Sequence, residues 1–293
     1  MVLVLVAAAP ARAAGLAPGD AGEKVRRLQV RVAGWFPGSR AQVHFVLDGV
    51  YGEQTVSAVR AFQRHYGLRA DGLAGPSTFA VLSRLTDRDG STRHFDYSEF
   101  TQNRNRACSA QANAYAGTFK GGRAPSRRVR RNVRRVMWRL EALRAKGGAE
   151  AIGINSAFRS VAYNSCIGGA GLSQHMYGTA ADNRMANVSN QLERRLAKAS
   201  EFHGIGCYAA LAHNHLDVRM DNRDLPGAQV WWWPDKDGRG RDLDANGRVC
   251  WGQKLTPTST ASLEGDTSAP WASSDELEAW ADAGEPRHLG SAD

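Results

Sequence analysis

SQHMYGTAAD runs from Ser173 to Asp182 and brings a histidine, a glycine and an aspartate close together along the chain. His175 and Asp182 are seven positions apart, with Gly178 between them. Because glycine adopts backbone angles that other residues avoid, Gly178 allows a tight turn that folds the chain back on itself. The imidazole and the carboxylate can then share one divalent metal ion, so this stretch predicts half of a metal site.

A second stretch, HNHLDVR at residues 213–219, adds alternating polar side chains. On a β-strand His213, His215 and Asp217 would all lie on one side, which an edge or active-site strand tolerates and a core strand does not. Two histidines and one aspartate form a three-ligand catalytic zinc site, with a fourth position for a water whose pKa falls to about 7. One zinc ion per chain is therefore expected, held by His175, Asp182 and a histidine of this second stretch.

Other histidines carry no comparable pattern. A single histidine is more often an ordinary surface or core residue than a metal ligand. We therefore expect five of the eight histidines to bind no metal. These are His44, His65, His94, His203 and His288.

Length and composition favour two domains of ordinary size. The chain has 293 residues, of which 42% are hydrophobic, enough for packed cores. The formal net charge of +9 and the pI of 9.7 favour contact with polyanions, whether nucleic acid, acidic lipid or anionic wall polymers. Charge alone does not choose among these three.

Both ends of the chain differ from the middle. Residues 1–14 begin with an almost purely apolar run and contain Ala11-Arg12-Ala13, a small-x-small cleavage pattern. They are too short to span a bilayer and predict a partial secretory signal, the alternative being a buried N-terminal segment. No other stretch approaches a membrane span. Residues 256–293 are rich in Ser, Thr, Ala and Asp and are expected to form a flexible tail.

The four cysteines show no CxxC spacing, which argues against a zinc knuckle or a thioredoxin-like redox site. An even number in an exported chain suggests two disulfides. The sequence permits three pairings, of which we favour Cys108–Cys166 and Cys207–Cys250.

Residues 15–86 show a helical pattern with an internal echo. Two DG turns are each followed by a glycine and a threonine, and Thr55 and Thr78 are expected to cap the helices that follow. The stretch DGVYGEQTVSAVRAFQRHYGLRADGLAGPSTFAVL resembles the three-helix peptidoglycan-binding domain of wall hydrolases, over residues 16–86. This resemblance implies that residues 15–86 hold the protein on peptidoglycan.

A polar segment, residues 87–106, is expected to be a linker, followed by a second domain at 107–255. Pro125 to Lys146 predicts a helix with one apolar face and a basic face that is solvated or, less favoured, contacts wall polymer. Residues 151–154 predict a buried strand. Short strands with intervening helices indicate an α+β domain.

The string SAFRS…CIGGAGLSQHMYGTAAD…HNHLDVR resembles the zinc D-Ala-D-Ala carboxypeptidases of actinobacterial type, relatives of the D-Ala-D-Ala dipeptidases and the hedgehog signalling domain. The resemblance covers residues 107–222 and implies an α+β zinc peptidase with an antiparallel sheet. It implies zinc binding by His175, Asp182 and His215. It also implies that Arg159 anchors the terminal carboxylate of the substrate and that Ser173 bonds near the metal or substrate.

The catalytic base departs from the family pattern. Many relatives carry a glutamate shortly before the last zinc ligand, whereas residues 207–212 contain none. His213 is the nearest titratable group, and we expect it to assist proton transfer, the alternative being that it only orients a neighbour. Asp217 is expected to hold a histidine in place or to buttress the strand.

The sequence thus predicts a monomeric, secreted, wall-associated carboxypeptidase that acts on peptidoglycan and binds no nucleic acid. Two alternatives stay open: an endopeptidase of the same superfamily, and a wall-binding protein with structural zinc. Two minor features are expected to be structural. Trp231–Trp233 is expected to pack against the core edge, and residues 235–247 resemble a calcium loop that lacks its final Glu.

Overall fold

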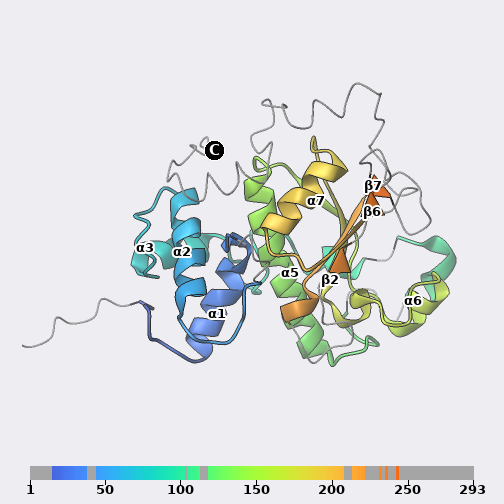
Figure 1. Cartoon of the computed structure of the whole chain (residues 1–293). Helices are drawn as coiled ribbons and strands as arrows, with labels where there is room; N and C mark the ends of the chain where they lie inside the picture. Colours follow the sequence, from blue (N-terminus) through green and yellow to red (C-terminus); the bar gives the residue numbers. More distant parts are fainter. Residues whose placement is uncertain are drawn as a thin grey trace, which may run out of the picture.

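The computed structural model describes residues 15–37, 44–102, 104–112, 118–207, 213–221, 231–232, 235–236 and 242–243. The expected signal at 1–14 and the expected tail at 256–293 lie outside these ranges and stay predictions. A helical domain packs on one side of the long helix α5, and a sheet with its own helices packs on the other (Figure 1). The class is α+β, as the sequence predicts.

Three helices form the N-terminal domain, which confirms the expected three-helix arrangement. Their apolar faces meet in one core, in which the rings of Trp35 and Phe62 stand nearly perpendicular with their centroids 5.9 Å apart. The 3₁₀ turn Ala33–Trp35 completes the first helix. The three helices are α1 (Glu23–Val32), α2 (Glu53–His65) and α3 (Pro76–Arg84).

A buried glutamine organises the first DG turn. The Gln29 amide donates to Asp48 Oδ1 at 2.8 Å and to Thr55 Oγ1 at 3.1 Å, and its carbonyl accepts from Gly49 N at 2.8 Å. Gly49 has φ +79°, a conformation that glycine adopts without strain. Thr55 is therefore not the expected helix cap. Gly52 precedes the helix instead, and Thr55 lies inside its first turn.

The second DG turn repeats this network. Gln63 Nε2 donates to Asp71 Oδ1 at 3.0 Å and to Thr78 Oγ1 at 3.1 Å, and its Oε1 accepts from Gly72 N at 2.8 Å. Thr78 again lies in the first turn and not at the cap, which is Gly75. The echo in the sequence is thus a duplicated Gln–Asp–Thr network.

Gln63→Ala is expected to lower the free energy of unfolding by about 2–4 kcal/mol, because it leaves buried donors and acceptors without partners. Gln29→Ala is expected to cost a similar amount, since its network is the same. Urea denaturation measures both, and the exposed Gln102 supplies the control Gln102→Ala. Equal stabilities of all three variants would contradict this account.

Helix α5 (Ser126–Lys146) is shared between the two domains. Trp138 and Ala142 belong to the core of the helical domain, whereas Met137 and Leu140 belong to the core under the sheet. The expected basic solvated face therefore holds only for the first half of the helix. In the second half Lys146 is buried and donates to Gly34 O at 2.8 Å, and burial lowers its pKa to about 7.

The peptidase domain is built on one sheet in the order β1-β2-β4-β3-β5. Its first four strands are antiparallel, as expected, but β5 runs parallel to β3 at the edge. The strands are β1 (Ile152–Ser156), β2 (Ala180–Met185), β3 (Gly204–Cys207), β4 (Asn214–Asp217) and β5 (Trp231–Trp232). A separate antiparallel pair consists of β6 (Asp235–Lys236) and β7 (Asp242–Leu243).

A disulfide holds the start of this domain. Cys108 and Cys166 are bonded, with Cα atoms 5.9 Å apart across 58 positions, which confirms the favoured pairing. A loop of this length contributes on the order of 4 kcal/mol. The expected Cys207–Cys250 bond stays a prediction, because Cys250 lies outside the described residues. The remaining helices are α4 (Ser109–Ala112), α6 (Val161–Cys166) and α7 (Asn190–Ala199).

The segment at 87–106 differs from the expected polar linker. Phe95, Tyr97 and Phe100 belong to the core under the sheet, and Phe100 O accepts from Phe158 N at 2.9 Å. These three aromatic residues are separated by polar and charged residues and show neither helical nor strand periodicity. Their burial could therefore not be predicted from the sequence. Among the described residues, we find no helix that combines the length and apolarity needed to cross a membrane.

Candidate metal centre

The register of the sheet brings two of the expected ligands together. Asp182 in β2 lies directly opposite His215 in β4. On its other side Asp182 pairs with Ser156 of β1, at a point where the register shifts. Both side chains are buried, at 3% and 5% exposure, in the middle of the domain. Antiparallel pairing therefore places a carboxylate and an imidazole face to face.

The third ligand comes from the 3₁₀ turn Gln174–Tyr177, just before β2. Gly178 ends that turn with φ +71°, and a Cβ there would lie 2.7 Å from the side chain of Val129. Only glycine fits this conformation and this space. The turn directs the buried His175 back over Asp182, as the spacing of the motif predicts.

Three ligand atoms converge on one point. His175 Nε2 lies 3.2 Å from Asp182 Oδ1 and 3.1 Å from His215 Nδ1, and these last two atoms are 3.0 Å apart. Two ligands of one tetrahedral zinc ion lie roughly 3.3 Å apart, given metal–ligand bonds of about 2.0–2.2 Å. The observed triangle matches this spacing, so the three residues fit a zinc ion.

Hydrogen bonds behind the ligands fix which nitrogen faces the centre. His175 Nδ1 donates to Ala157 O at 2.6 Å, which leaves Nε2 for a metal. His215 Nε2 lies 3.1 Å from Asp217 Oδ2, which leaves Nδ1 for a metal. Such partners orient metal-binding imidazoles. The expected role of Asp217 as a holder of histidine is consistent with this contact.

Asp217 is itself clamped. Arg219 Nε donates to both oxygens of the Asp217 carboxylate, at 2.8 and 3.0 Å. Gly204 on the neighbouring β3 makes room for that carboxylate, since a Cβ there would lie 2.0 Å from Asp217 Oδ2. Arg219 and Gly204 were not identified from the sequence, because their roles depend on contact across the sheet.

The electrostatics of the cluster suit a cation. Burial, and next the Arg159 charge, lower the pKa of His175 to about 4, so this imidazole is neutral. Burial alone would raise the pKa of Asp182, but His175, His215 and Arg159 hold it well below its usual value. Burial alone would lower the pKa of His215, but Asp182 and Asp217 raise it to about 9. The two ionised carboxylates therefore already stabilise positive charge here.

Arg159 lies at the same centre. Its Nη2 donates to Asp182 Oδ2 at 2.6 Å, and its Nε donates to Ser156 Oγ at 3.0 Å. Among the described residues, Nη1 has no hydrogen-bond partner, and the side chain is 13% exposed. The guanidinium can therefore keep its hold on Asp182 and present a second edge to a ligand.

His213 also borders the cluster, just ahead of β4. Its Nε2 lies 4.0 Å from Asp182 Oδ2, and Asn155 Nδ2 lies 3.4 Å from its Nδ1. Burial lowers the pKa of His213, so its neutral form dominates near neutrality. Asn155 is a neighbour that the sequence did not identify, because its position on β1 relative to His213 is set by the fold.

Ser173 precedes the turn that carries His175 and is half-buried. Its carbonyl accepts from Met176 N at 3.1 Å, which helps to form that turn. Its expected hydrogen bond near the metal or substrate stays a prediction. The calcium-like loop at 235–247 lies largely outside the described residues, as does Trp233 of the tryptophan run.

Comparison with known proteins agrees with this geometry. Residues 93–217 match the family model described as Peptidase M15. Over 189 residues, the chain is 41% identical to the zinc D-Ala-D-Ala carboxypeptidase of Streptomyces albus G, covering 64% of this chain and 67% of that protein. The chain belongs to the Peptidase M15 family. The match begins within the segment expected to be a linker, as the buried Phe95 and Phe100 also indicate.

The helical domain of this M15 peptidase has relatives of its own. Residues 22–82 match the family model described as a putative peptidoglycan binding domain. The chain is 42% identical over 69 residues to a probable N-acetylmuramoyl-L-alanine amidase of Bacillus licheniformis, covering 23% of this chain and 18% of that protein. It is 41% identical over 76 residues to a spore cortex-lytic enzyme of Bacillus cereus, covering 25% and 27%. Matches this short indicate a shared domain and not a shared activity.

Proposed function

We propose that this chain is a secreted zinc carboxypeptidase that removes C-terminal D-alanine from peptidoglycan stem or cross-bridge peptides. The observation that carries the proposal is the convergence of His175 Nε2, Asp182 Oδ1 and His215 Nδ1 beside the Arg159 guanidinium. A metal-binding triangle next to a carboxylate-binding group suits hydrolysis at the end of a peptide. Membership of the M15 family and the name of the Streptomyces relative support it.

The residues divide the work by chemistry. When bound by His175, Asp182 and His215, zinc polarises a carbonyl and lowers the pKa of water. Arg159 anchors the terminal carboxylate of the substrate through charge-assisted hydrogen bonds. Its contact with Asp182 fixes the distance between that anchor and the metal ligands. The scissile bond is thereby limited to the one nearest the free carboxyl end.

His213 moves the proton in this proposal. A neutral imidazole 4.0 Å from Asp182 can accept a proton from the attacking water and return it to the leaving amine. Asn155, 3.4 Å away, orients the ring from its other nitrogen. In this chain His213 takes the place of the missing glutamate.

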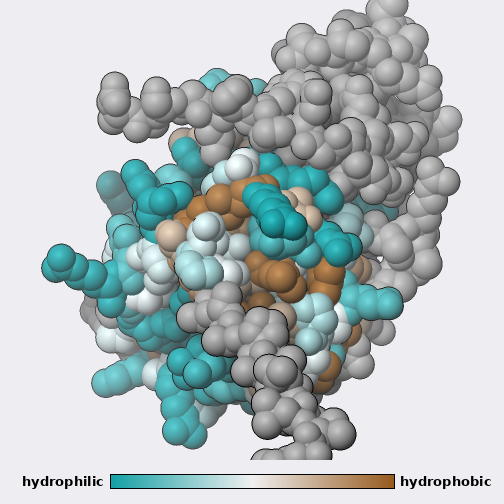
Figure 2. Space-filling view, turned by 90° about the vertical axis from the view of Figure 1, so that its left-hand side faces the viewer, coloured by the Kyte–Doolittle hydropathy of each residue, from teal (hydrophilic) through white to brown (hydrophobic). Residues whose placement is uncertain are grey.

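We propose that the helical domain holds the enzyme on the wall as a monomer. Its outer face is mostly hydrophilic, with apolar side chains gathered near the middle (Figure 2). Val50 and Leu73, at the two equivalent DG turns, are 49% and 45% exposed. Where exposed apolar side chains gather into a contiguous patch, they can mark a binding surface. The net charge of +9 adds attraction to anionic wall polymers.

The decisive experiment incubates the full chain with diacetyl-Lys-D-Ala-D-Ala, with and without a chelator, and measures free D-Ala. We expect release that stops on chelation and returns when zinc is added. Absence of release, with sacculi bound but uncut, would favour a non-catalytic wall-binding protein. Release of larger fragments from sacculi, with no free D-Ala, would favour an endopeptidase.

His213→Ala is expected to lower kcat by about 10²–10⁴-fold, the usual contribution of a general acid–base group. The zinc content should equal that of the wild type, because His213 lies outside the triangle of ligand atoms. Metal analysis and D-Ala release test the two statements together. Unchanged turnover would remove His213 from the mechanism, and lost zinc would make it a ligand.

A further inference from the structure

A second cluster of metal-binding side chains lies where the two domains meet. His44 belongs to the connection between α1 and α2, and Glu201 and His203 lie between α7 and β3. Glu201 Oε2 is 3.7 Å from His44 Nδ1 and 3.9 Å from His203 Nε2. The two imidazole rings stand at 89° with centroids 5.1 Å apart. One ligand atom from each of the three residues lies within 4.8 Å of the other two, as is also the case for His175, Asp182 and His215.

Three imidazole nitrogens at this point are buried without hydrogen bonds. Among the described residues, neither His203 nitrogen has a hydrogen-bond partner, and neither does His44 Nδ1. His203 is 0% exposed. Buried polar atoms nearly always have a hydrogen-bond partner, and leaving one without a partner destabilises the folded state. A metal ion bound by these nitrogens would remove that destabilisation.

The cluster is held in place by the backbone. Glu201 has φ +59°, a left-handed conformation that is strained for a residue with a side chain. Glu201 Oε2 accepts from Phe45 N at 2.9 Å, which points the carboxylate at the segment that carries His44. His203 N donates to Asp217 O at 2.9 Å, which ties the cluster to β4.

The positive charges near the cluster do not prevent a metal ion from binding. Arg139 Nε donates to Glu201 O, but the Arg139 charge is paired with Asp221 at 3.0 Å. Lys146 is also close to Glu201, and burial lowers its pKa to about 7. Burial, and next the Arg139 charge, lower the pKa of His203 to about 3, so this imidazole is neutral and has a lone pair to donate.

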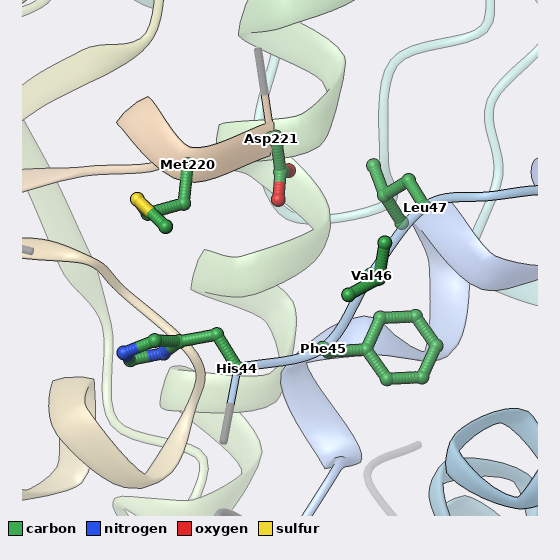
Figure 3. A pocket seen from close by; sticks show the side chains of 6 residues that line it. All are labelled: His44, Phe45, Val46, Leu47, Met220 and Asp221. Carbon is green, nitrogen blue, oxygen red and sulfur yellow. The ribbon is translucent and has the colours of Figure 1, made fainter. Parts of the chain in front are cut away.

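A small pocket borders the cluster at His44. It has a volume of about 210 Å³ and shares His44 with the cluster. Figure 3 shows the His44 ring and the Met220 side chain pointing to the same side, with Asp221 close by. The pocket is lined by His44, Phe45, Val46, Leu47, Met220 and Asp221.

We propose that His44, Glu201 and His203 form a second site for a divalent transition ion such as Zn²⁺, which links the helical domain to the peptidase domain. Imidazole and carboxylate ligands suit zinc. Glu201 Oε2 lies 3.7 and 3.9 Å from the two imidazole nitrogens, which is more than the roughly 3.3 Å between ligands of one tetrahedral zinc, so the side chains would move closer together on binding. This assignment differs from the sequence-based expectation that His44 and His203 bind no metal.

Native mass spectrometry of the full chain with added Zn²⁺ tests the proposal. The wild type is expected to carry two zinc ions, and His44→Ala and the nearly isosteric Glu201→Gln are expected to carry one. His94→Ala is the matched control, because His94 also pairs with a buried glutamate, its Nδ1 lying 2.8 Å from Glu141 Oε2. It is expected to keep two ions. A single zinc in the wild type, or two in both His44→Ala and Glu201→Gln, would overturn the second site.

Hydrolysis separates this site from the catalytic one. His44→Ala should still release D-Ala, since the first triad is intact. In an Asp182→Asn background, where the first site is disrupted, excess zinc at about 100 times Kd should raise Tm by about 5–10 °C. Adding His44→Ala should abolish that rise. Persistence of the rise would show binding elsewhere on the chain and refute the proposal.

Discussion

Asp182→Asn is expected to lower kcat/KM for D-Ala release by about 10³-fold or more. Asp182 Oδ1 lies 3.2 and 3.0 Å from the two histidine ligand atoms, so it is one corner of the metal-binding triangle. An amide oxygen is neutral and binds zinc less tightly than a carboxylate. Metal catalysis contributes several kcal/mol, and each factor of ten in rate corresponds to about 1.4 kcal/mol.

Two further variants provide a scale for the loss of activity in Asp182→Asn. Asp217→Asn should cost about 10–100-fold, the usual loss when a group that orients a ligand is removed. Asp87→Asn, at an exposed position, should change nothing measurable. Steady-state kinetics and zinc analysis together rank the three variants by their loss of activity and of bound zinc. If Asp182→Asn and Asp217→Asn behaved alike, the triangle would not be the catalytic metal site.

Arg159→Ala is expected to raise KM and lower kcat/KM by about 10–10²-fold on substrates with a free C-terminal carboxylate. The physical reason is the loss of a charge-assisted hydrogen bond worth about 1.5–3 kcal/mol. The effect should depend on the substrate. The wild type should prefer diacetyl-Lys-D-Ala-D-Ala to its C-terminal amide, and Arg159→Ala should lose most of that preference.

This design isolates the anchor from the metal site. Arg159 Nη2 also donates to Asp182 at 2.6 Å, so its removal disturbs a metal ligand as well. Such a disturbance slows both substrates equally, whereas loss of the anchor slows only the free acid. Arg159→Lys keeps the charge but not the bidentate geometry and should fall between the two. An unchanged preference in Arg159→Ala would assign Arg159 to holding Asp182 alone.

Helical periodicity in the sequence correctly predicts a helix where one face of that helix is buried. The apolar positions of residues 125–146 predict α5, because a helix repeats every 3.6 residues. The packing of Trp138 against the helical domain could not be predicted, because the sequence does not indicate that this helix contacts a second domain. The aromatics at 95–100 were missed for a related reason. They fill a core without any regular spacing.

The duplicated DG turns also show a local pattern that the sequence predicts and long-range contacts that it does not. The DG repeats were visible, but the two glutamines that join Asp to Thr were not predicted as their centre. Gln29 and Asp48 are 19 positions apart, and only folding brings them to 2.8 Å. The threonines were therefore assigned to helix caps, the commonest local role of that residue before a helix.

By itself, the sequence determined the chemistry of the metal centre. The two stretches that carry histidine and aspartate predicted a zinc site because zinc requires particular side chains. The family resemblance singled out His175, Asp182 and His215, and Gly178 indicated where the chain turns. Only the tertiary structure decided what surrounds those ligands, with Arg159 bonded to Asp182 and Asp217 clamped by Arg219. It alone also brought His44 to Glu201 and His203 in a separate cluster. The identity of a ligand is local chemistry, whereas its partners depend on strand register and domain packing, which place distant segments within a few ångströms of one another.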